Sequence, residues 1–240
     1  MDFDIFKEEL LNLSKKINIT LDYNQIEKFY KYMNILLEWN EKINLTAITE
    51  PIDIILKHFI DSLTISKYIA KNAKIIDIGT GAGFPGIPIK IIREDVEIVL
   101  LDSLNKRVNF LNDVISKLDL KNIKAIHSRV EELGKNKQYR EMFNVATSRA
   151  VANMSTLSEY LLPLIKENGI AICMKGSDYK EELDKGENAI KILGGRIEKI
   201  EELYLPNSNV KRSLIILKKV KNTPNKYPRK AGIPAKEPLN

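Results

Sequence analysis

A glycine-rich loop that follows an apolar run constrains the fold of this 240-residue chain more than any other feature. Residues 74–86 read KIIDIGTGAGFPG, in which a strand-like segment ends and a run of closely spaced glycines begins. These glycines are Gly79, Gly81, Gly83 and Gly86. Because glycine has no Cβ, backbone N–H groups can approach a ligand closely where a strand gives way to a helix. The order of strand, loop and helix predicts a nucleotide cradle in an α/β fold.

Two acidic residues at the ends of strand-like runs indicate the kind of cofactor. Asp77 would repel a dinucleotide pyrophosphate, whereas it would attract the ammonium and sulfonium groups of S-adenosylmethionine. A second apolar run, residues 96–102, ends at Asp102, about twenty residues beyond the loop, where a carboxylate can accept both hydroxyls of a ribose. The loop also matches the dinucleotide pattern G-x-G-x-x-G, so spacing alone leaves open a nicotinamide cofactor or a tight turn that binds no ligand.

Positive charge is concentrated at the C-terminus. The last 23 residues contain seven lysines and arginines against one glutamate and four prolines, and the remainder of the chain is neutral. Such a segment is typical of an arm that neutralises RNA phosphates, and its candidate RNA-binding residues are Lys226, Arg229 and Lys230. A solvated tail that keeps the protein in solution is the alternative interpretation.

Length and composition limit the classes of protein to which this chain can belong. A chain of this size with 44% hydrophobic residues has room for one α/β domain and a small appendage. The N-terminus is acidic, unlike a signal peptide, and no apolar run approaches the roughly 18 to 20 residues that span a bilayer, so we expect a cytoplasmic protein without membrane contact. Cys173 has no disulfide partner and we expect it in the core. Nothing predicts a metal site or requires a dimer, so we expect a monomer.

The first seventy residues read as helical. Apolar residues recur at helical spacing over residues 3–17 and again after a possible cap at Asp22. A further helix should begin near Pro51 and bring His58 and Asp61 close together. For these two residues we favour an ordinary surface pair, because the sequence supplies no nucleophile or metal partner for them.

Strand and helix signals alternate after the glycine loop, which predicts a doubly wound, mostly parallel sheet. The expected helices include Asn105–Lys117 and Met154–Ile165, and the expected strands are Ile123–His127, Phe143–Thr147, Gly169–Met174, Ile197–Leu205 and Arg212–Val220. The carboxyl ends of the early strands should share one edge, where open α/β sheets bind ligands. We expect Asp77, Asp102, the loop after His127, and the loop at Ser148 and Arg149 to line that edge.

Several motifs together resemble the RsmG family, also called glucose-inhibited division protein B. They are NLTA at 44–47, HFIDS at 58–62, DIGTGAGFPGIP at 77–88, LLDS at 100–103 with Lys106 and Arg107, RVEE at 129–132, TSRA at 147–150, KG at 175–176 and YPRKAGIPAKEPL at 227–239. The resemblance covers nearly the whole chain. It implies a Rossmann-like methyltransferase that uses S-adenosylmethionine to methylate N7 of a guanine in 16S ribosomal RNA, either as free RNA or in a small-subunit particle.

The resemblance also implies roles for individual residues. The backbone at Gly79 and the ring of Phe84 would hold the cofactor, Asp102 would meet its ribose, and Val130 and Glu131 would flank its adenine. Arg149 would face the site, where it can hold the guanine O6 or a phosphate, with a structural salt bridge as the alternative. The expected cofactor set is Asp77, Gly79, Gly81, Gly83, Phe84, Asp102, Ser103, Val130, Glu131 and Arg149, with Arg149 also the candidate catalytic residue. The expected parts are a helical extension (1–70), a methyltransferase domain (71–220) and a basic arm (221–240).

Motifs of other methyl-transfer chemistries are absent from the sequence. The position where an N-P-P-Y-like turn would serve an exocyclic amine reads TSRA, and Cys173 follows Ile172 instead of the proline of a Pro-Cys nucleophile. Guanine N7 carries a lone pair and no proton, so its methylation needs proximity and aim but no general base. A small-molecule methyltransferase, a nicotinamide oxidoreductase and a non-catalytic assembly factor remain the rival interpretations.

Overall fold

The computed structural model describes residues 1–239 and contains a seven-stranded sheet in the order β3-β2-β1-β4-β5-β7-β6. The first five strands pair in parallel, and β7 pairs antiparallel with both β5 and β6. The doubly wound, mostly parallel sheet expected from the sequence is therefore confirmed. The strands are β1 (Lys74–Ile78), β2 (Glu97–Asp102), β3 (Ile123–His127), β4 (Phe143–Arg149), β5 (Ile165–Lys175), β6 (Gly195–Tyr204) and β7 (Lys211–Lys219).

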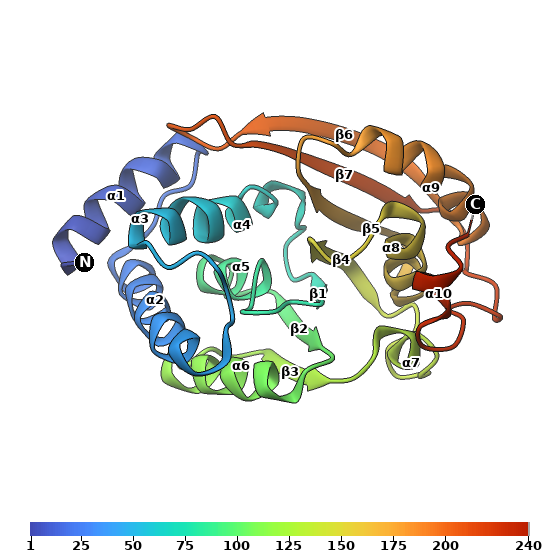
Figure 1. Cartoon of the computed structure of the whole chain (residues 1–240), viewed down its shortest axis with the longest axis horizontal. Helices are drawn as coiled ribbons and strands as arrows, with labels where there is room; N and C mark the ends of the chain where they lie inside the picture. The colour runs from blue at the N-terminus through green and yellow to red at the C-terminus, as the bar shows by residue number, and fades with distance from the viewer. Residues whose placement is uncertain (240) are drawn as a thin grey trace.

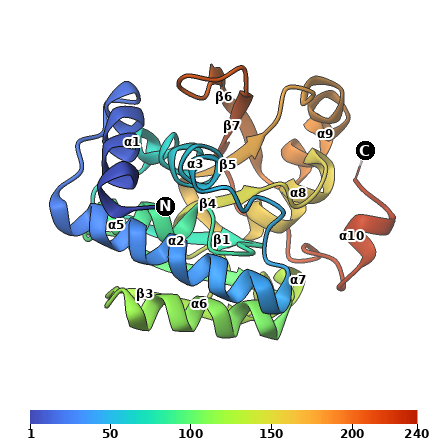
Figure 2. The same ribbon diagram turned by 60° about the vertical axis from the view of Figure 1, so that its left-hand side comes forward.

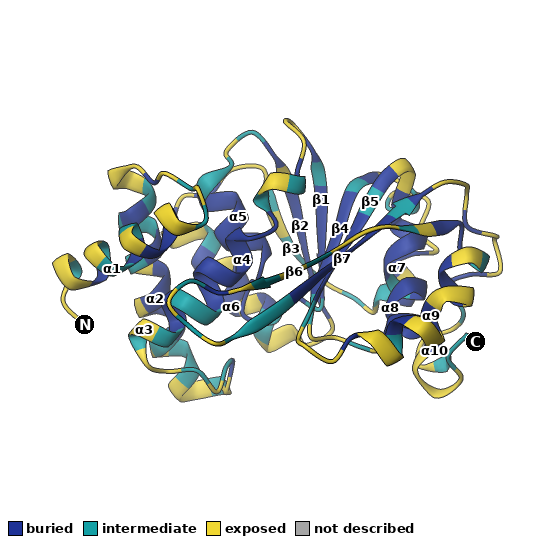
Figure 3. Ribbon diagram, turned by 90° about the horizontal axis from the view of Figure 1, so that it is seen from above, coloured by how far each residue is buried: buried dark blue, intermediate teal, exposed yellow. Residues whose placement is uncertain are grey.

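Helices cover both faces of the sheet, which leaves the central strands buried between two layers (Figures 1 and 3). One layer contains α1 (Phe3–Lys16), α2 (Tyr23–Ile43), α3 (Pro51–Ile54), the π-helical η1 (Ile55–Ile60), α4 (Asp61–Leu63), η2 (Ser66–Tyr68), α5 (Gly86–Ile92) and α6 (Asn105–Lys117). The other contains α7 (Val130–Leu133), α8 (Met154–Leu161), η3 (Leu162–Leu164), α9 (Lys180–Ile192) and α10 (Ile233–Lys236). Burial on both faces explains why the central strands read as continuous apolar runs.

The N-terminal helices belong to the same hydrophobic core as one face of the sheet. Asp22 caps α2 by accepting from the Gln25 backbone N–H, and the Gln25 side chain accepts from the Asp22 N–H in return. Figure 2 shows α2 lying along α6, and the Tyr32 hydroxyl of α2 donates to the Ala82 carbonyl in the glycine loop. The helical extension therefore supports the loop that the sequence identifies as the cradle.

The expected boundary between the helix that begins at Met154 and the strand after it is wrong. The sequence predicts a helix over Met154–Ile165, but α8 ends at Leu161, a short 3-10 turn follows, and β5 begins at Ile165. Pro163 accounts for the difference, because proline lacks an N–H and its ring clashes with the preceding turn of an α-helix. The strand therefore begins four residues earlier than Gly169.

The C-terminal segment, residues 221–239, packs against the α7 and α8 side of the molecule (Figure 1). Tyr227 is only 6% exposed. The Arg140 guanidinium donates to the carbonyls of Thr223 and Tyr227, both at 2.7 Å. The segment is thus anchored along its length, although several of its lysines remain exposed.

Candidate cofactor and substrate site

The backbone of the glycine loop needs glycine for two reasons. Gly79, Gly81 and Gly83 have φ values of 61°, 61° and 92°, a left-handed conformation that disfavours other residues. At Gly83 a Cβ would lie 2.5 Å from Cδ1 of Ile87 and 2.7 Å from the hydroxyl oxygen of Tyr32. At these three positions, therefore, the turn from β1 into α5 favours a residue without a side chain.

Asp77 lies beneath this loop and is fully buried. Its Oδ2 accepts from the backbone N–H of Gly86 at 2.8 Å and from the hydroxyl of Thr80 at 2.6 Å. Its Oδ1 is buried and has no hydrogen-bond partner among residues 1–239. Burial raises the pKa of the Asp77 carboxyl to about 7. An unpaired carboxylate oxygen below the loop suits a ligand that brings a cation or an N–H donor.

Asp102 ends β2 beside the loop. Its carboxylate accepts from the backbone N–H groups of Gly81 and Leu104, both at 2.9 Å, and Nη1 of Arg107 lies 3.5 Å from Oδ2. The acid is held in one orientation at the carboxyl edge of the sheet, as the sequence predicts. Its contact with Gly81 also ties the glycine loop to β2.

A cavity of about 230 Å³ opens between the loop, the end of β2 and α7. Five residues predicted from the sequence line it: Gly79, Asp102, Ser103, Val130 and Glu131. The loop after His127, which the sequence placed at this edge, adds Ser128 and Arg129. The other lining residues were not singled out from the sequence: Ile78, Leu101, Val151 and Tyr160. The residues that line the pocket suit an adenosine. The Asp102 carboxylate can accept hydrogen bonds from the ribose hydroxyls, and apolar Val130 and the backbone of α7 lie next to it. This hollow is called the cofactor pocket below.

The remaining predicted cofactor residues do not line this pocket. Asp77 lies below the loop, and Gly81 and Gly83 shape its backbone. The Phe84 ring is buried, and it stacks on the His58 ring with centroids 4.3 Å apart. These residues form or support the loop beside the pocket, but they do not line the pocket themselves.

Arg149 is the centre of a buried polar cluster at the end of β4. Its Nη1 donates to the Lys57 carbonyl at 2.9 Å and to Oδ2 of Asp61 at 3.2 Å, and its Nη2 donates to Nδ1 of His58 at 3.0 Å. The guanidinium also lies 4.9 Å from the centre of the Phe84 ring. The salt bridge that the sequence left as an alternative for Arg149 is therefore present.

The expectation of a surface pair for His58 and Asp61 is wrong. Their side chains are buried, and Asp61, only 1% exposed, also accepts from Nε of Arg212 at 3.1 Å. The spacing of the two residues could not show that the face of the helix that carries them packs against the end of β4. The HFIDS motif was the available signal, since it placed a histidine and an aspartate in an otherwise apolar run.

Arg149 also lines a second hollow, of about 360 Å³, together with Lys57, His58, Asp61, Lys175 and Arg212. We call it the arginine pocket. Within residues 1–239, it shares no lining residue with the cofactor pocket. Its polar residues carry net positive charge, which favours an electron-rich or anionic group.

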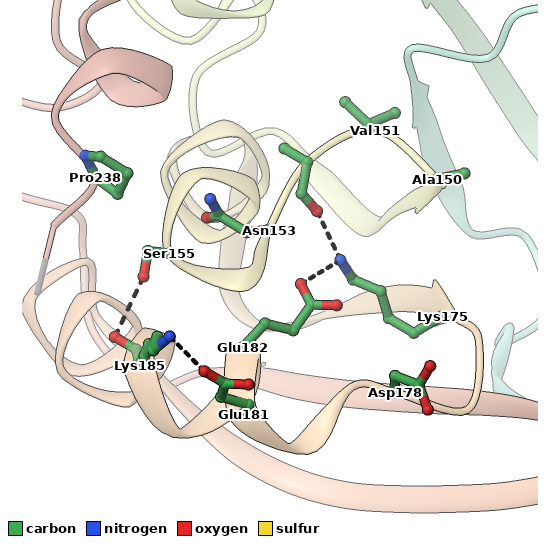
Figure 4. Close-up of a pocket in the computed structure, with 11 residues that line it drawn as sticks. Ala150, Val151, Asn153, Ser155, Lys175, Asp178, Glu181, Glu182, Lys185 and Pro238 are labelled. Carbon is green, nitrogen blue, oxygen red and sulfur yellow. Dashed lines mark hydrogen bonds and ion pairs between the residues drawn. The ribbon is translucent and has the colours of Figure 1, made fainter.

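The segment Ala150–Asn153 separates these hollows from a third one of about 710 Å³, drawn in Figure 4. Ala150 has a left-handed φ of 57°, and Cγ2 of Val151 lies 2.7 Å from the place where a Cβ on Gly79 would stand. In the third hollow the Lys175 ammonium donates to the Ala152 carbonyl at 2.6 Å and to Glu182 at 2.7 Å (Figure 4). The segment thus borders all three hollows, since Val151 also lines the cofactor pocket and Ala150 also lines the arginine pocket.

The three predicted RNA-binding residues have different environments. Lys226 and Lys230 are exposed. Arg229 instead forms a bidentate ion pair with fully buried Glu159, at 3.1 Å from Nε to Oε1 and 2.7 Å from Nη2 to Oε2. Its guanidinium therefore binds a carboxylate in the protein core.

Three further observations on residues 1–239 concern membrane spans, metal ligands and the single cysteine. No helix in this part is long and apolar enough to cross a membrane. It contains no group of three or more His, Cys, Asp and Glu residues that could hold a metal ion. Cys173 is buried as expected, and burial raises the pKa of its thiol to about 12, so it is not a reactive nucleophile.

The overall fold resembles that of solved structures, one of which is named a SAM-dependent methyltransferase. A SAM-dependent methyltransferase from Aquifex aeolicus aligns with a TM-score of 0.54 at 16% identity, covering 72% of this chain and 96% of that one. M. jannaschii TYW2 in complex with AdoMet aligns with a TM-score of 0.53 at 11% identity, covering 67% and 75%. These alignments show that the chain has the fold of S-adenosylmethionine-dependent methyltransferases.

The sequence comparisons identify the family. The model of the GidB family, described as rRNA small subunit methyltransferase G, matches residues 25–215. A ribosomal RNA small subunit methyltransferase G from Desulforamulus reducens is 55% identical over 96% of this chain and 97% of that protein. One from Clostridium tetani is 52% identical over 93% and 94%. The chain belongs to the GidB family, and the family resemblance noted from its motifs is confirmed.

Proposed function

We propose that this protein transfers a methyl group from S-adenosylmethionine to N7 of a guanine in 16S ribosomal RNA. The near full-length match to relatives named ribosomal RNA small subunit methyltransferase G carries this proposal. An rRNA substrate fits a cytoplasmic protein, and a single copy of the chain contains every residue that the proposal needs.

The cofactor would occupy the pocket between the glycine loop and α7. Asp102 would accept the ribose hydroxyls, and Val130 with the Glu131 backbone would flank the adenine. The unpaired Oδ1 of Asp77, which lies below the loop, would attract the positively charged ammonium group of the cofactor. When bound, S-adenosylmethionine supplies an electrophilic methyl group.

The target base would lie at the arginine pocket, with Arg149 as its contact. Arginine has five N–H donors, and three of those of Arg149 bind Lys57, Asp61 and His58. In the described part of the chain, Nε–H and one Nη2 hydrogen have no hydrogen-bond partner, so they are available to guanine O6 or a phosphate. This contact would orient the purine and leave the N7 lone pair free to attack.

Charge balance in this cluster also suits N7 methylation. The transfer moves a positive charge onto the purine, and a free guanidinium nearby would oppose it. The Asp61 carboxylate lies between Arg149 and Arg212 and offsets part of their charge. Burial and the Arg149 charge lower the pKa of His58 to about 3, so His58 adds no further charge at neutral pH.

The decisive experiment is methyl transfer from labelled S-adenosylmethionine to small-subunit particles and to free 16S RNA, followed by mapping of the modified nucleotide. We expect one N7-methylguanine. Arg149→Ala should cut the rate by on the order of 100-fold and leave RNA affinity nearly unchanged. NADH binding without S-adenosylmethionine binding in calorimetry would contradict the proposal, and so would cofactor binding without any transfer to RNA.

A further inference from the structure

The C-terminal segment connects the two helices that form one wall of the cofactor pocket. We propose that residues 227–236 are a structural part of that pocket and that Arg229 and Glu159 are positioning residues for the cofactor. The inference rests on the proposed function only in taking S-adenosylmethionine as the ligand. Figure 1 shows α10 beside α7 and α8, which are far apart from it in sequence.

Three contacts hold α7 to this segment. The Glu131 carboxylate accepts from the backbone N–H of Gly232 at 2.9 Å. The Arg140 guanidinium bridges the carbonyls of Gly134 and Tyr227, at 3.0 Å and 2.7 Å. Gly134 also packs so closely against Pro228 that a Cβ there would lie 2.8 Å from Cγ of the proline. The helix that carries Val130 and Glu131 is therefore fixed from outside the pocket.

Two contacts hold α8 to the same segment. Glu159 is 0% exposed, and it accepts from the backbone N–H of Arg229 at 2.7 Å as well as from its guanidinium. The Thr156 hydroxyl donates to the Pro234 carbonyl at 3.0 Å. A buried carboxylate held by a bidentate guanidinium is strongly oriented.

Tyr160 makes the connection to the pocket itself. It lines the cofactor pocket from α8 together with Val130 and Glu131 from α7. Burial raises the pKa of its hydroxyl, and the nearby charges of Glu131 and Glu159 raise it further. Tyr160 therefore shares the pocket lining with Glu131 and follows Glu159 directly in α8, and these are the two acids that bind the C-terminal segment. If either acid loses its partner, α7 and α8 can separate and the adenine end of the pocket widens.

Arg229 therefore has a different role from the lysines beside it. Its guanidinium already binds Glu159, and breaking that pair to reach a phosphate would leave a buried carboxylate without a partner. Lys230 is the next residue, carries the same charge and is exposed. It is a matched control, because its replacement removes one charge without removing a contact to the core.

The test compares Arg229→Gln with Lys230→Gln in the full-length protein. Calorimetry should show S-adenosylmethionine binding weakened by about tenfold in Arg229→Gln and unchanged in Lys230→Gln. In methyl-transfer assays Arg229→Gln should raise the KM for the cofactor while kcat at saturating cofactor stays near that of the parent. Arg229→Lys, which keeps the charge but loses the bidentate geometry, should be intermediate.

Each outcome decides the inference. If Arg229→Gln lowers the melting temperature but binds S-adenosylmethionine like the parent well below that temperature, the segment is only a stabilising element and the inference is wrong. If Arg229→Gln does not fold, Thr156→Val removes a milder contact to the same segment, and an unchanged cofactor affinity there overturns the inference. Failure of the parent protein to bind S-adenosylmethionine would overturn the proposed function instead.

Discussion

Arg149 donates a hydrogen bond to Nδ1 of His58, over 3.0 Å. An arginine side chain can only donate, so Nδ1 must carry a lone pair, and the ring proton is on Nε2, 2.9 Å from the Thr46 hydroxyl oxygen. The depressed pKa of His58 agrees with this neutral tautomer. A residue that sequence spacing assigned to the surface therefore fixes the orientation of the predicted catalytic arginine.

The Asp61 carboxylate should matter for stability as well as for orientation. Asp61→Asn leaves Arg149 and Arg212 without a buried counter-charge and should lower the free energy of unfolding by up to about 3 kcal/mol. Asp53→Asn is the control, because its ion pair with Lys57 is partly solvent-exposed and should be worth less than about 0.5 kcal/mol. Denaturant titration of both variants measures the difference. Equal effects would mean that the buried pair adds nothing to stability.

Gly79→Val should abolish cofactor binding and leave most of the fold intact. The residue has a φ of 61°, and a Cβ there would meet Cγ2 of Val151 at 2.7 Å inside the pocket wall. Gly81→Ala shares the backbone strain, but its nearest heavy atom would be 4.0 Å away. Calorimetry should therefore show a much smaller loss for Gly81→Ala, from strain of about 1 to 2 kcal/mol alone. Parent-like binding by Gly79→Val would place the cofactor elsewhere.

Most helices and strands, and the glycine loop, could be predicted from the sequence because they depend on residues that are close together in the chain. Asn105–Lys117 and Ile123–His127 have the expected bounds, and Asp102 lies at the end of its strand next to the glycine loop. Long-range contacts are different. Only the folded chain could bring Arg229 to Glu159, because no sequence pattern specifies a partner seventy residues away.

The same limit explains the errors at the site. Burial of His58 and Asp61 depends on which face of their helix meets β4, and apolar spacing did not resolve this. Val151 and Tyr160 line the cofactor pocket from a loop and from α8, where the sequence gave no signal for a ligand. Residues at the ends of the early strands were accessible to sequence reasoning, and residues that reach the pocket from these later segments were not.

Asp102→Ala should weaken S-adenosylmethionine binding by about 1 to 3 kcal/mol, the usual loss when a charged acceptor of hydrogen bonds is removed. RNA affinity should hardly change, because Asp102 is buried at the loop. Paired titrations with cofactor and with RNA test this. A parallel loss of both affinities would show that Asp102 maintains the fold through Gly81 and Leu104 and has no specific role at the ribose.

The exposed lysines of the C-terminal segment should control the salt dependence of RNA binding. Replacing Lys226 and Lys230 with glutamine removes two potential phosphate contacts, so the log–log slope should flatten by about 1.4 units on single-stranded RNA. Arg229→Gln should leave the slope nearly unchanged, because that guanidinium binds Glu159. An unchanged slope in the double lysine variant would make the segment a solubilising one and move RNA binding to another surface.

The buried Asp77 predicts that cofactor affinity depends on pH below neutrality. Its folded-state pKa of about 7 lies above the ordinary value of 3.8, so the unligated protein holds an extra proton between about pH 4 and 7. In that window stability should fall as pH rises, since the buried carboxyl must give up its proton. Binding of a cation favours the charged carboxylate, so S-adenosylmethionine affinity should rise from pH 5 to pH 7, by at most about tenfold per unit. Asp77→Asn should remove both dependences, and calorimetry across this range in parent and variant measures them. A cofactor affinity that rises with pH equally in Asp77→Asn would assign the proton to another group.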